Sequence, residues 1–488
     1  MFRSPCPAPR RVVLTSTAPS SVADLRTPTP DAPHARTVLA VASLGFFLIT
    51  LDILIVNVAL TSISSDLGGG TSGQQWVIDS YTLLFASLLL FAGNLADRAG
   101  AKRALALGIV VFAVASGACA AALSTGALVA ARFAQGAGAA ILLPASMALV
   151  RGAFPDPRRR ARALGIWAVG GAVAGLVGQP LGGLLTTLDW RWVFLINLPV
   201  CAGMLAFLTT VARSPTRAAP FDWAGQVLAV VALSALTFGL IDGGHAGFGA
   251  PRVVAVLALA FLAVAGFVAV QARVRHPMMP LDLFRSTGFR IALSVGFTFM
   301  VGNYGNVFVT SLLLQQHLGL SPLRAGLAFL PSAFFAIVGN LASGSITNRF
   351  GPRVPIVAGQ LLMAAGLLGM TAAVSRSSPV LLALLIIPVA AGGSLAMPPV
   401  TGVVLDGVRT ERAGTASAVF NTFRQVGGAV AIAVFGALIA DPDGFESGAR
   451  ASFAVAAALL LTTALVSLRV RPRAQAGAQS HGRAPAQS

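Results

Sequence analysis

The stretch GNLADRAGAKR, residues 93–103, gathers charge in a chain that otherwise carries little of it. Asp97, Arg98, Lys102 and Arg103 lie close together here, whereas only 10% of the 488 residues are charged and 56% are hydrophobic. Lys102 is the only lysine of the whole chain. Long apolar segments flank the stretch on both sides, so it is a polar connection between two of them.

The apolar segments are long enough to cross a bilayer, which takes roughly 18 residues or more. VLAVASLGFFLITLDILIVNVAL, residues 38–60, is a clear example, and the mean hydropathy of the chain is +0.81. The segments are rich in Gly, Ala and Leu and lack the alternation of membrane strands, so they should be helices. The sequence predicts an all-α polytopic membrane protein with fourteen transmembrane helices.

The distribution of positive charge predicts the orientation in the membrane. When the connections are assigned alternately to two sides, one side and both tails hold 27 of the 34 Lys and Arg residues. Cytoplasmic loops are the ones enriched in Lys and Arg, so both termini should be cytoplasmic. The net charge of +18 therefore indicates membrane topology and does not point to nucleic acid. The polar, basic tails 1–37 and 470–488 are predicted to be disordered.

A partial repeat of the opening stretch indicates two related halves. In GSITNRFGPR, residues 344–353, three residues of the stretch recur, each 251 positions later, and Asn348 stands where the acid would be. Repeated halves are typical of secondary transporters, which bind substrate where the halves meet. We expect six-helix halves at 38–211 and 289–469, with two inserted helices and a cytoplasmic linker at 212–288. The recurring residues are Gly93, Arg98 and Gly100, matched by Gly344, Arg349 and Gly351.

Several motifs together resemble a known family. GNLADRAGAKR resembles the loop motif of the major facilitator superfamily, with matches at Gly93, Asp97, Arg98, Gly100, Lys102 and Arg103. LDILIVNVAL (51–60) and RFAQGAGAA (132–140) resemble the first-helix and fourth-helix motifs of its fourteen-span drug:proton antiporters. Further similar segments are WRWVFLINLP (190–199), FDWAGQ (221–226), RHPMMPLDLF (275–284) and NTFRQVGGA (421–429). The resemblance covers residues 38–470 and implies the major facilitator fold and proton-driven export.

One motif departs from the family pattern. The antiporter motif of the fifth helix reads Gly-Pro-x-x-Gly-Gly in the family, but here it is GQPLGG, residues 178–183. The proline is displaced by one position and should still kink the helix. Small residues on one face allow helices to approach closely. We interpret this helix as a variant antiporter motif, with Gly171, Gly175, Gly178, Pro180, Gly182 and Gly183 as its members.

Few ionisable residues lie well inside the predicted spans, and such residues should face the protein interior or a cavity. Asp52, near mid-span, is the first candidate for proton coupling, with Asp79 as the second. The resemblance implies that Arg132 tunes the proton affinity of a neighbouring carboxylate. The alternatives are a hydrogen-bonded packing role for Asp52, outer-vestibule water around Asp79, and a structural ion pair of Arg132 with an acid such as Asp79.

Other polar residues in the spans are candidates for lining a cavity, although hydrogen bonds between helices explain them equally well. For Arg424 the alternative is a side chain that anchors the cytoplasmic end of its helix. The candidates are Asn57, Gln135, Asn303, Asn306, Asn421, Arg424 and Gln425.

The loop charges point to a different role. Asp97, beside Arg98, can pair with basic groups or helix termini of the opposite half when the cytoplasmic side is closed. We therefore interpret residues 93–103 as a conformational latch and topology anchor. Because Asn348 has no charge, the latch should be asymmetric.

Enzyme and ATPase functions are disfavoured by the sequence. The five histidines lie in tails, loops or span ends, the three cysteines have no metal-binding spacing, and no phosphate-binding Gly-rich loop is present. We expect a multi-pass protein of the cytoplasmic membrane, acting as a monomer without cofactor, that exports drug-like small molecules in exchange for protons. The alternatives are a facilitator or proton symporter for uptake, and a membrane sensor that does not transport.

Overall fold

The computed structural model describes residues 34–216, 221–376, 378–406, 408, 412–441 and 443–470. Within these ranges all regular structure is helical, and fourteen helical segments are long and apolar enough to cross a membrane. The predicted fold class is therefore confirmed. The predicted disorder of the tails concerns residues that lie almost entirely outside the described ranges.

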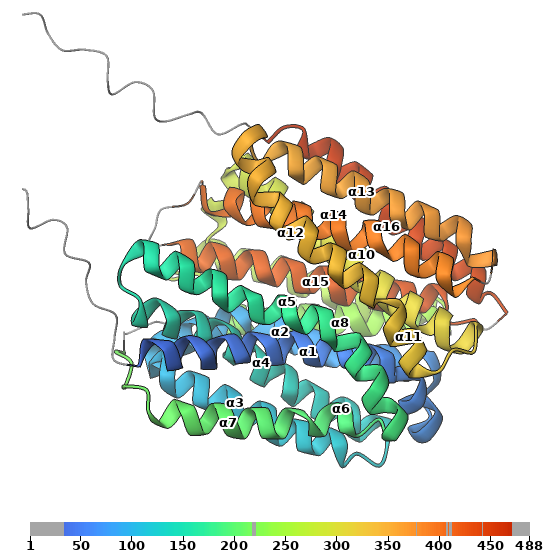
Figure 1. Ribbon diagram of the computed structural model, residues 1–488, viewed down its shortest axis with the longest axis horizontal. Coiled ribbons are helices and arrows are strands. Elements are labelled where there is room, and N and C mark those ends of the chain that lie inside the picture. Colours follow the sequence, from blue (N-terminus) through green and yellow to red (C-terminus); the bar gives the residue numbers. More distant parts are fainter. Residues whose placement is uncertain are drawn as a thin grey trace, which may run out of the picture.

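The first seven helices pack into one bundle, the N bundle (Figure 1). Within it α1 packs on α5, α2 on α4, and α3 on both α4 and α7. Its members are α1 (Ala35–Leu67), α2 (Gly70–Ala99), α3 (Ala101–Ala120), α4 (Thr125–Ala153), α5 (Pro157–Leu188), α6 (Trp192–Leu195) and α7 (Asn197–Thr209).

A second group of helices forms the C bundle, which lies beside the first (Figure 1). Here α13 packs on α14 and α16, α12 on α14, and α10 on α15. Its members are α10 (Thr287–Leu312), η3 (Leu313–His317), α11 (Pro322–Ala328), α12 (Leu330–Phe350), α13 (Arg353–Ala373), η4 (Val374–Arg376), α14 (Pro379–Asp406), α15 (Ala413–Leu438) and α16 (Phe445–Ser467).

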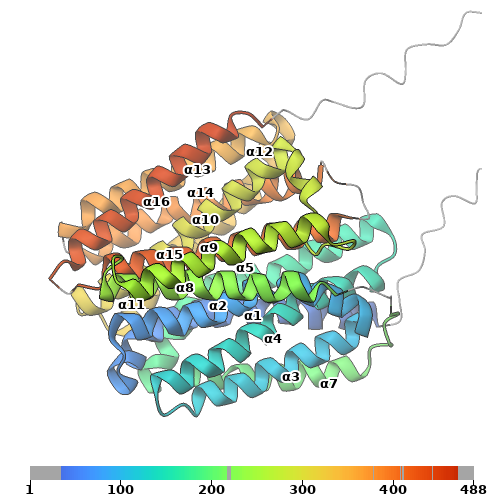
Figure 2. The same cartoon turned by 180° about the vertical axis from the view of Figure 1, so that it is seen from behind.

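Two further helices lie along the junction of the bundles (Figure 2). The helices α8 (Trp223–Ala246) and α9 (Pro251–Arg273) pack on each other, and α8 also contacts α2 and α15. Asp222 caps α8 by accepting a hydrogen bond from the Gly225 amide at 2.8 Å. Its second oxygen accepts one from Gln271 of α9 at 2.5 Å, which fastens the two helices together. The short η2 (Leu281–Arg285) leads on to α10.

Three of the spans are interrupted, which the apolar pattern does not indicate. The sixth is divided into α6 and α7 at Ile196, and the tenth into α11 and α12 at Phe329. The ninth ends in the π-helical turn η3. Interruptions of this kind often occur at functional sites, because they turn side chains out of the regular helical register.

Burial differs among the helices as expected for a protein that lipid surrounds. The most apolar helix, α9, is the least buried within the protein, whereas the less apolar α2 and α10 are the most buried. The end of the bundle at which α1 ends and α2 begins is the one that the charge pattern places outside the cell. We refer to it as the outer end.

Candidate functional site

A buried ion pair lies in the middle of the N bundle. Asp52 is near the centre of α1 and is 0% exposed. Its Oδ2 atom lies 2.5 Å from Nη1 of Arg132, a residue of α4 that is 1% exposed. Arg132 Nε also donates to the Val77 carbonyl of α2 at 2.9 Å. Arg132 therefore forms an ion pair with an acid, as one alternative held, but the acid is Asp52 and not Asp79, because α4 directs the guanidinium toward α1.

Uncharged donors complete the cluster around Asp52. Its Oδ1 atom accepts hydrogen bonds from Gln135 Nε2 at 2.8 Å and from Asn197 Nδ2 at 2.9 Å. Both amides also donate to Ser116 Oγ, at 2.9 and 3.3 Å. Four helices, α1, α3, α4 and α7, thus contribute to a site in which both carboxylate oxygens are satisfied. Removing such a pair from water is tolerated only when its remaining polar atoms are bonded.

Local sequence explains how α4 reaches this position. Arg132 and Gln135 are three residues apart, so they share one face of the helix. Gly136 lies against the backbone of α2, where an added Cβ would come within 2.3 Å of the Tyr81 carbonyl oxygen. Only a glycine allows that approach. The guanidinium then lies over the Tyr81 ring, 4.4 Å from its centroid.

Sequence reasoning did not single out Asn197 or Ser116, which belong to the cluster. Asn197 is the first residue of α7, directly after the break at Ile196. The WRWVFLINLP stretch contains it, so a polar amide within a motif of an apolar span was the available signal. Ser116 is a small polar residue in α3 and carries no comparable signal.

Asp79 lies outside this cluster. It is a residue of α2, it is 0% exposed, and neither carboxylate oxygen has a hydrogen-bond partner in the described part of the chain. The alternative that places Asp79 in vestibule water is not what the structure shows, because neighbouring helices enclose it. Gln75, one turn earlier on α2, contacts α15, so Asp79 lies on the helix face that points toward the C bundle.

The polar candidates of the C bundle remain separate from the Asp52 cluster. Arg424 of α15 donates to Asn421 Oδ1 at 3.1 Å and lies 5.8 Å from the ring centroids of both Phe299 and Phe420. These contacts hold the guanidinium within the bundle, so the helix-end anchor is not the arrangement observed. Gln425 is 5% exposed, and its Nε2 atom is without a partner among the described residues.

The candidate asparagines bond mainly within their own helices. Asn57 donates to the Ile53 carbonyl at 2.7 Å, and Asn421 donates to Ser417 at 3.0 Å. Asn306 accepts from Thr310 at 3.0 Å, and Asn303 is half-buried on α10. The structure therefore does not bring these four residues together into one polar site.

The charged loop fastens helices of the N bundle to one another. Gly100 has φ of +85° and ends α2, and Gly351 ends α12 in the same way with φ of +77°. Lys102 donates to the carbonyls of Thr209, at 3.3 Å, and Val211. It therefore holds the end of α7. Arg103 is exposed.

Gly93 and Arg98 are two further members of the loop motif. Gly93 lies inside α2, and an added Cβ would meet nothing within 4 Å, so it takes no part in the turn. Arg98 lies 5.2 Å from the ring centroid of Phe221, in the segment before α8. This cation–π contact links the loop to the segment that leads into the inserted helices.

Asp97 lies near Arg151, an arginine that faces the C bundle. Its carboxylate interacts electrostatically with Arg151 of α4. Arg151 Nη1 lies 3.4 Å from the position of a Cβ at Gly414, in the first turn of α15. The negative charge of Asp97 thus lies near an arginine that faces the opposite bundle.

The variant antiporter helix α5 lies on the face of the N bundle that meets the C bundle, and it packs closely on both sides. An added Cβ at Gly182 would lie 2.8 Å from Ile55 of α1, and one at Gly178 would lie 2.8 Å from Leu54. On the opposite side, a Cβ at Gly183 would lie 2.6 Å from the Pro322 carbonyl oxygen of α11. Gly175, by contrast, has open space around it, and Gly171 faces the Phe46 ring. Pro180 is within α5, between these contacts.

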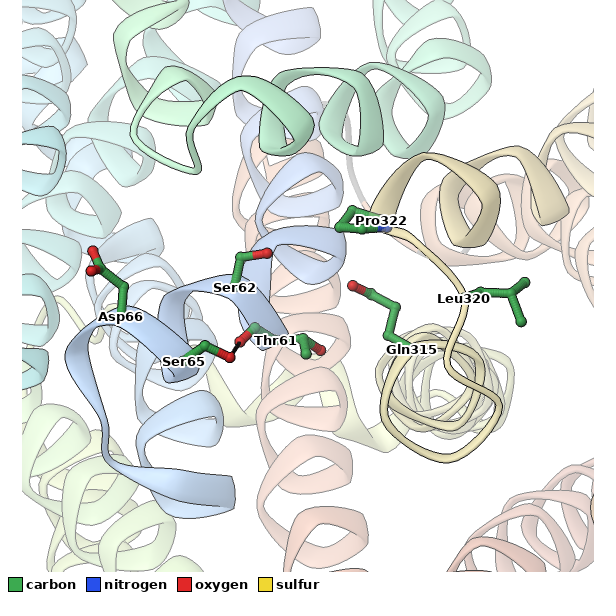
Figure 3. Close-up of a pocket in the computed structure, with 7 residues that line it drawn as sticks. All are labelled: Thr61, Ser62, Ser65, Asp66, Gln315, Leu320 and Pro322. Carbon is green, nitrogen blue, oxygen red and sulfur yellow. Dashed lines mark hydrogen bonds between the residues drawn. The ribbon is translucent and has the colours of Figure 1, made fainter.

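A pocket of about 390 Å³ opens at the outer end, between α1 and the segment that joins η3 to α11 (Figure 3). Hydroxyl groups from the end of α1 line one side, and Gln315 lines the other, with its side-chain oxygen pointing to the side where Ser62 lies. The run TSISSD at 61–66 was the sequence signal for it. The lining residues are Thr61, Ser62, Ser65, Asp66, Gln315, Leu320 and Pro322.

Asp66 forms the rim of this pocket. It accepts hydrogen bonds from Trp190 Nε1 at 2.9 Å and from Arg191 Nη1 at 3.0 Å. Across the described residues, no group of three or more His, Cys, Asp or Glu side chains is placed to hold a metal ion.

Comparison with known proteins places this geometry in context. Residues 42–432 match the Major Facilitator Superfamily. The chain is 38% identical to the methylenomycin A resistance protein of Streptomyces coelicolor, over 88% of this chain and 91% of that protein. It is 39% identical to multidrug resistance protein Stp of Mycobacterium tuberculosis, over 82% and 75% of the two chains.

A third relative and a solved structure extend the comparison. The tetracenomycin C resistance and export protein of Streptomyces glaucescens is 36% identical, over 84% of this chain and 76% of its own. The fold is similar to the crystal structure of a D-xylose–proton symporter, with a TM-score of 0.64 at 14% identity. That match covers 90% of this chain and 98% of the symporter.

Proposed function

We propose that this chain, which belongs to the major facilitator superfamily, exports small hydrophobic or amphiphilic compounds by exchange for protons. Relatives named for drug resistance or export, at 36–39% identity, support efflux as the direction. The fourteen apolar helical segments support a multi-pass membrane protein. We further propose that it resides in the cytoplasmic membrane, with both termini in the cytoplasm, and works as a monomer without a cofactor.

The Asp52–Arg132 ion pair is the observation that carries proton exchange. An acid inside a membrane protein is costly to bury, so its presence there indicates a paired or a functional residue. When a proton binds to the Asp52 carboxylate, the acid becomes neutral and its attraction to Arg132 is lost. The guanidinium is then held by the Val77 carbonyl, Gln135 and the Tyr81 ring, without its charged partner on α1. Loss of the proton restores the pair, so one titration changes how α1 and α4 are held together.

Gln135 and Asn197 act as positioning residues in this proposal. Both donate to Oδ1 of Asp52, leaving Oδ2 to the arginine. They are uncharged, so they keep the carboxyl group in place whether or not it holds a proton. Asp79 is the second candidate for proton binding, because it is buried and forms no ion pair with any described residue.

Alternating access supplies the transport step in this proposal. The two bundles, with limits at 38–211 and 289–469, move against each other, and residues 93–103 favour the state closed on the cytoplasmic side. We propose that the substrate passes between the bundles, near Asp79 and the polar residues of α15. The candidate cavity residues Asn303, Arg424 and Gln425 belong to that route.

Export is tested by a toxicity panel in a host that lacks its own efflux pumps. Expression should raise the tolerated concentration of amphiphilic antibiotics, and a protonophore should abolish this protection at an unchanged amount of protein. Protection that persists with the protonophore would favour a facilitator. Increased sensitivity would favour uptake. No effect on any compound, with the protein present in the membrane, would favour a sensor.

A further inference from the structure

Two buried glutamines join the N bundle to the C bundle at the outer end. The first is Gln75 of α2, which is 0% exposed. Its Nε2 atom donates to two backbone carbonyls of α15, that of Ala433 at 2.9 Å and that of Ile432 at 3.2 Å. Its side chain lies directly against Gly436, where an added Cβ would come within 2.2 Å of Nε2. The glycine thus provides the space that the glutamine fills.

The second glutamine makes the same kind of contact from the opposite bundle. Gln315 is 7% exposed, and its Nε2 atom donates to the Val58 carbonyl of α1 at 3.1 Å. It also donates to Ser311 Oγ at 3.0 Å, and Ser311 in turn donates to the Asn57 carbonyl at 3.1 Å. Gln315 is the middle residue of the π-helical turn η3. A widened turn redirects side chains relative to a regular helix.

These contacts are suited to repeated breaking. The acceptors are carbonyl groups within helices, and a carbonyl oxygen has two lone pairs, so it can accept a second hydrogen bond while keeping its helical one. Separation of the bundles therefore leaves no helix carbonyl without a partner. The glutamine amides and the Ser311 hydroxyl need new partners, which water can provide.

The outer pocket lies beside the second contact. Gln315 lines the pocket, and its Oε1 atom has no partner among the described residues. The oxygen is buried and points to the side where Ser62 projects from α1 (Figure 3). One side chain thus bonds across the closed seam with its nitrogen, while its oxygen is left without a partner at the wall of the outer pocket.

We propose that Gln75 and Gln315 form the outer seal of the transport route, and that the pocket is the chamber through which substrate leaves. Breaking the two glutamine contacts separates α2 from α15 and α1 from α10, and so connects the interior to the pocket. The free Gln315 oxygen then offers a hydrogen-bond acceptor to a departing compound. This inference rests on the proposed export function for its direction, although the seal itself can be tested without any substrate.

The chain provides two matched controls. Gln74 is adjacent to Gln75 and 3% exposed, but it donates within the N bundle, to Leu60 at 3.5 Å. Gln360 is 2% exposed and donates within the C bundle, to Ile356 and Ser467 at 3.1 and 3.0 Å. Changing each of the four glutamines to methionine replaces a buried amide by an apolar side chain of similar size. Only two of the changes remove a contact between the bundles.

Access from outside is measured with an impermeant maleimide on whole cells, after alanine has replaced Cys6, Cys119 and Cys201. The reporter is Ala429→Cys, 6% exposed and one turn of α15 further inward than Ala433. Ser62→Cys, in the pocket, reports the chamber. We expect Ser62→Cys to react in every variant, because the pocket is open to the outside.

Ala429→Cys should react about fivefold faster in Gln75→Met and in Gln315→Met than in the parent, since losing one hydrogen bond shifts an equilibrium by roughly that factor. The Gln74→Met and Gln360→Met rates should equal the parent rate. Equal rates in all four variants would overturn the seal. Size-exclusion profiles check folding, and a leucine at the same position, which also lacks a donor, replaces any methionine variant that aggregates. Because no transport is measured, the result is independent of whether the chain exports drugs.

Discussion

The Oδ2 atom of Asp52 lies 2.5 Å from Nη1 of Arg132, and neither side chain is more than 1% exposed. The two residues are 80 positions apart in the sequence. Burying both charges is costly, and the pair is stable here because Gln135, Asn197 and the Val77 carbonyl satisfy the remaining polar atoms.

Loss of one partner should cost more than loss of both. Arg132→Gln leaves a buried carboxylate without its cation and should destabilise the protein by about 3–5 kcal/mol. Adding Asp52→Asn should recover most of that loss, because the second change removes the unpaired charge. Thermal unfolding of the purified variants in detergent measures the stability lost in the single variant and the stability recovered in the double variant. A double variant no more stable than Arg132→Gln would contradict the pairing.

Asp52→Asn alone should abolish proton-driven transport. Asparagine keeps the shape and can still bond within the cluster, but it cannot bind and release a proton. Purified protein in vesicles with an imposed pH gradient should show no gradient-driven accumulation, while exchange down a substrate gradient can continue. Transport at the wild-type rate would move the proton site elsewhere, with Asp79→Asn as the next variant to test.

Asp97→Asn should slow transport without preventing membrane insertion. The change removes a negative charge close to Arg151, which lies near Gly414 of the C bundle. Asn348→Asp, at the exposed equivalent position, should have much less effect. Efflux rates at matched expression measure the difference. An unaltered rate in Asp97→Asn would reduce the loop to a topology anchor.

Two glycines of α5 should respond differently to one added methyl group. At Gly182 the new Cβ would lie 2.8 Å from the α1 backbone, and overpacking of this kind costs about 1–3 kcal/mol. At Gly175 nothing lies within 4 Å, so the alanine should be neutral or stabilise the helix by up to about 1 kcal/mol. Melting temperatures and efflux rates of the two alanine variants should therefore diverge, and similar values would show that α5 is not closely packed at Gly182.

The orientation in the membrane is tested by two single cysteines in a cysteine-free protein. Ser72→Cys, in the first turn of α2, should react with an impermeant thiol reagent on intact cells. Ser480→Cys, in the basic C-terminal tail, should react only after the cells are opened. The opposite order would reverse the topology, and labelling of both would require an odd number of spans.

The sequence was sufficient for the fourteen spans because their signal is local. A run of apolar residues predicts a membrane helix whatever its neighbours are. The partners of a buried charge are not local. The sequence indicated that Arg132 needs a carboxylate, but Asp52 and Asp79 were both available, and only the packing of α4 against α1 decides between them.

Uncharged polar residues were harder to interpret for the same reason. Gln74 and Gln75 are adjacent and equally polar, yet one donates to α1 and the other to α15. Their difference comes from the rotation of about 100° between successive residues on a helix. Nothing in a single sequence shows which neighbour each side of α2 faces. The π-helical turn that positions Gln315 is likewise a property of the folded chain.

Helix α8 touches both bundles. Near its start, Gln226 donates to the Ser87 carbonyl of α2 at 3.0 Å. Near its end, Gly244 lies against Ala437 of α15, with room for no larger side chain. The helix is therefore joined to the N bundle by a hydrogen bond, and it contacts the C bundle through small residues. In the proposed motion of the bundles, the hydrogen bond of Gln226 keeps α8 with α2, and α8 slides along α15 at Ala437. The inserted pair of helices can therefore remain in place through every transport cycle.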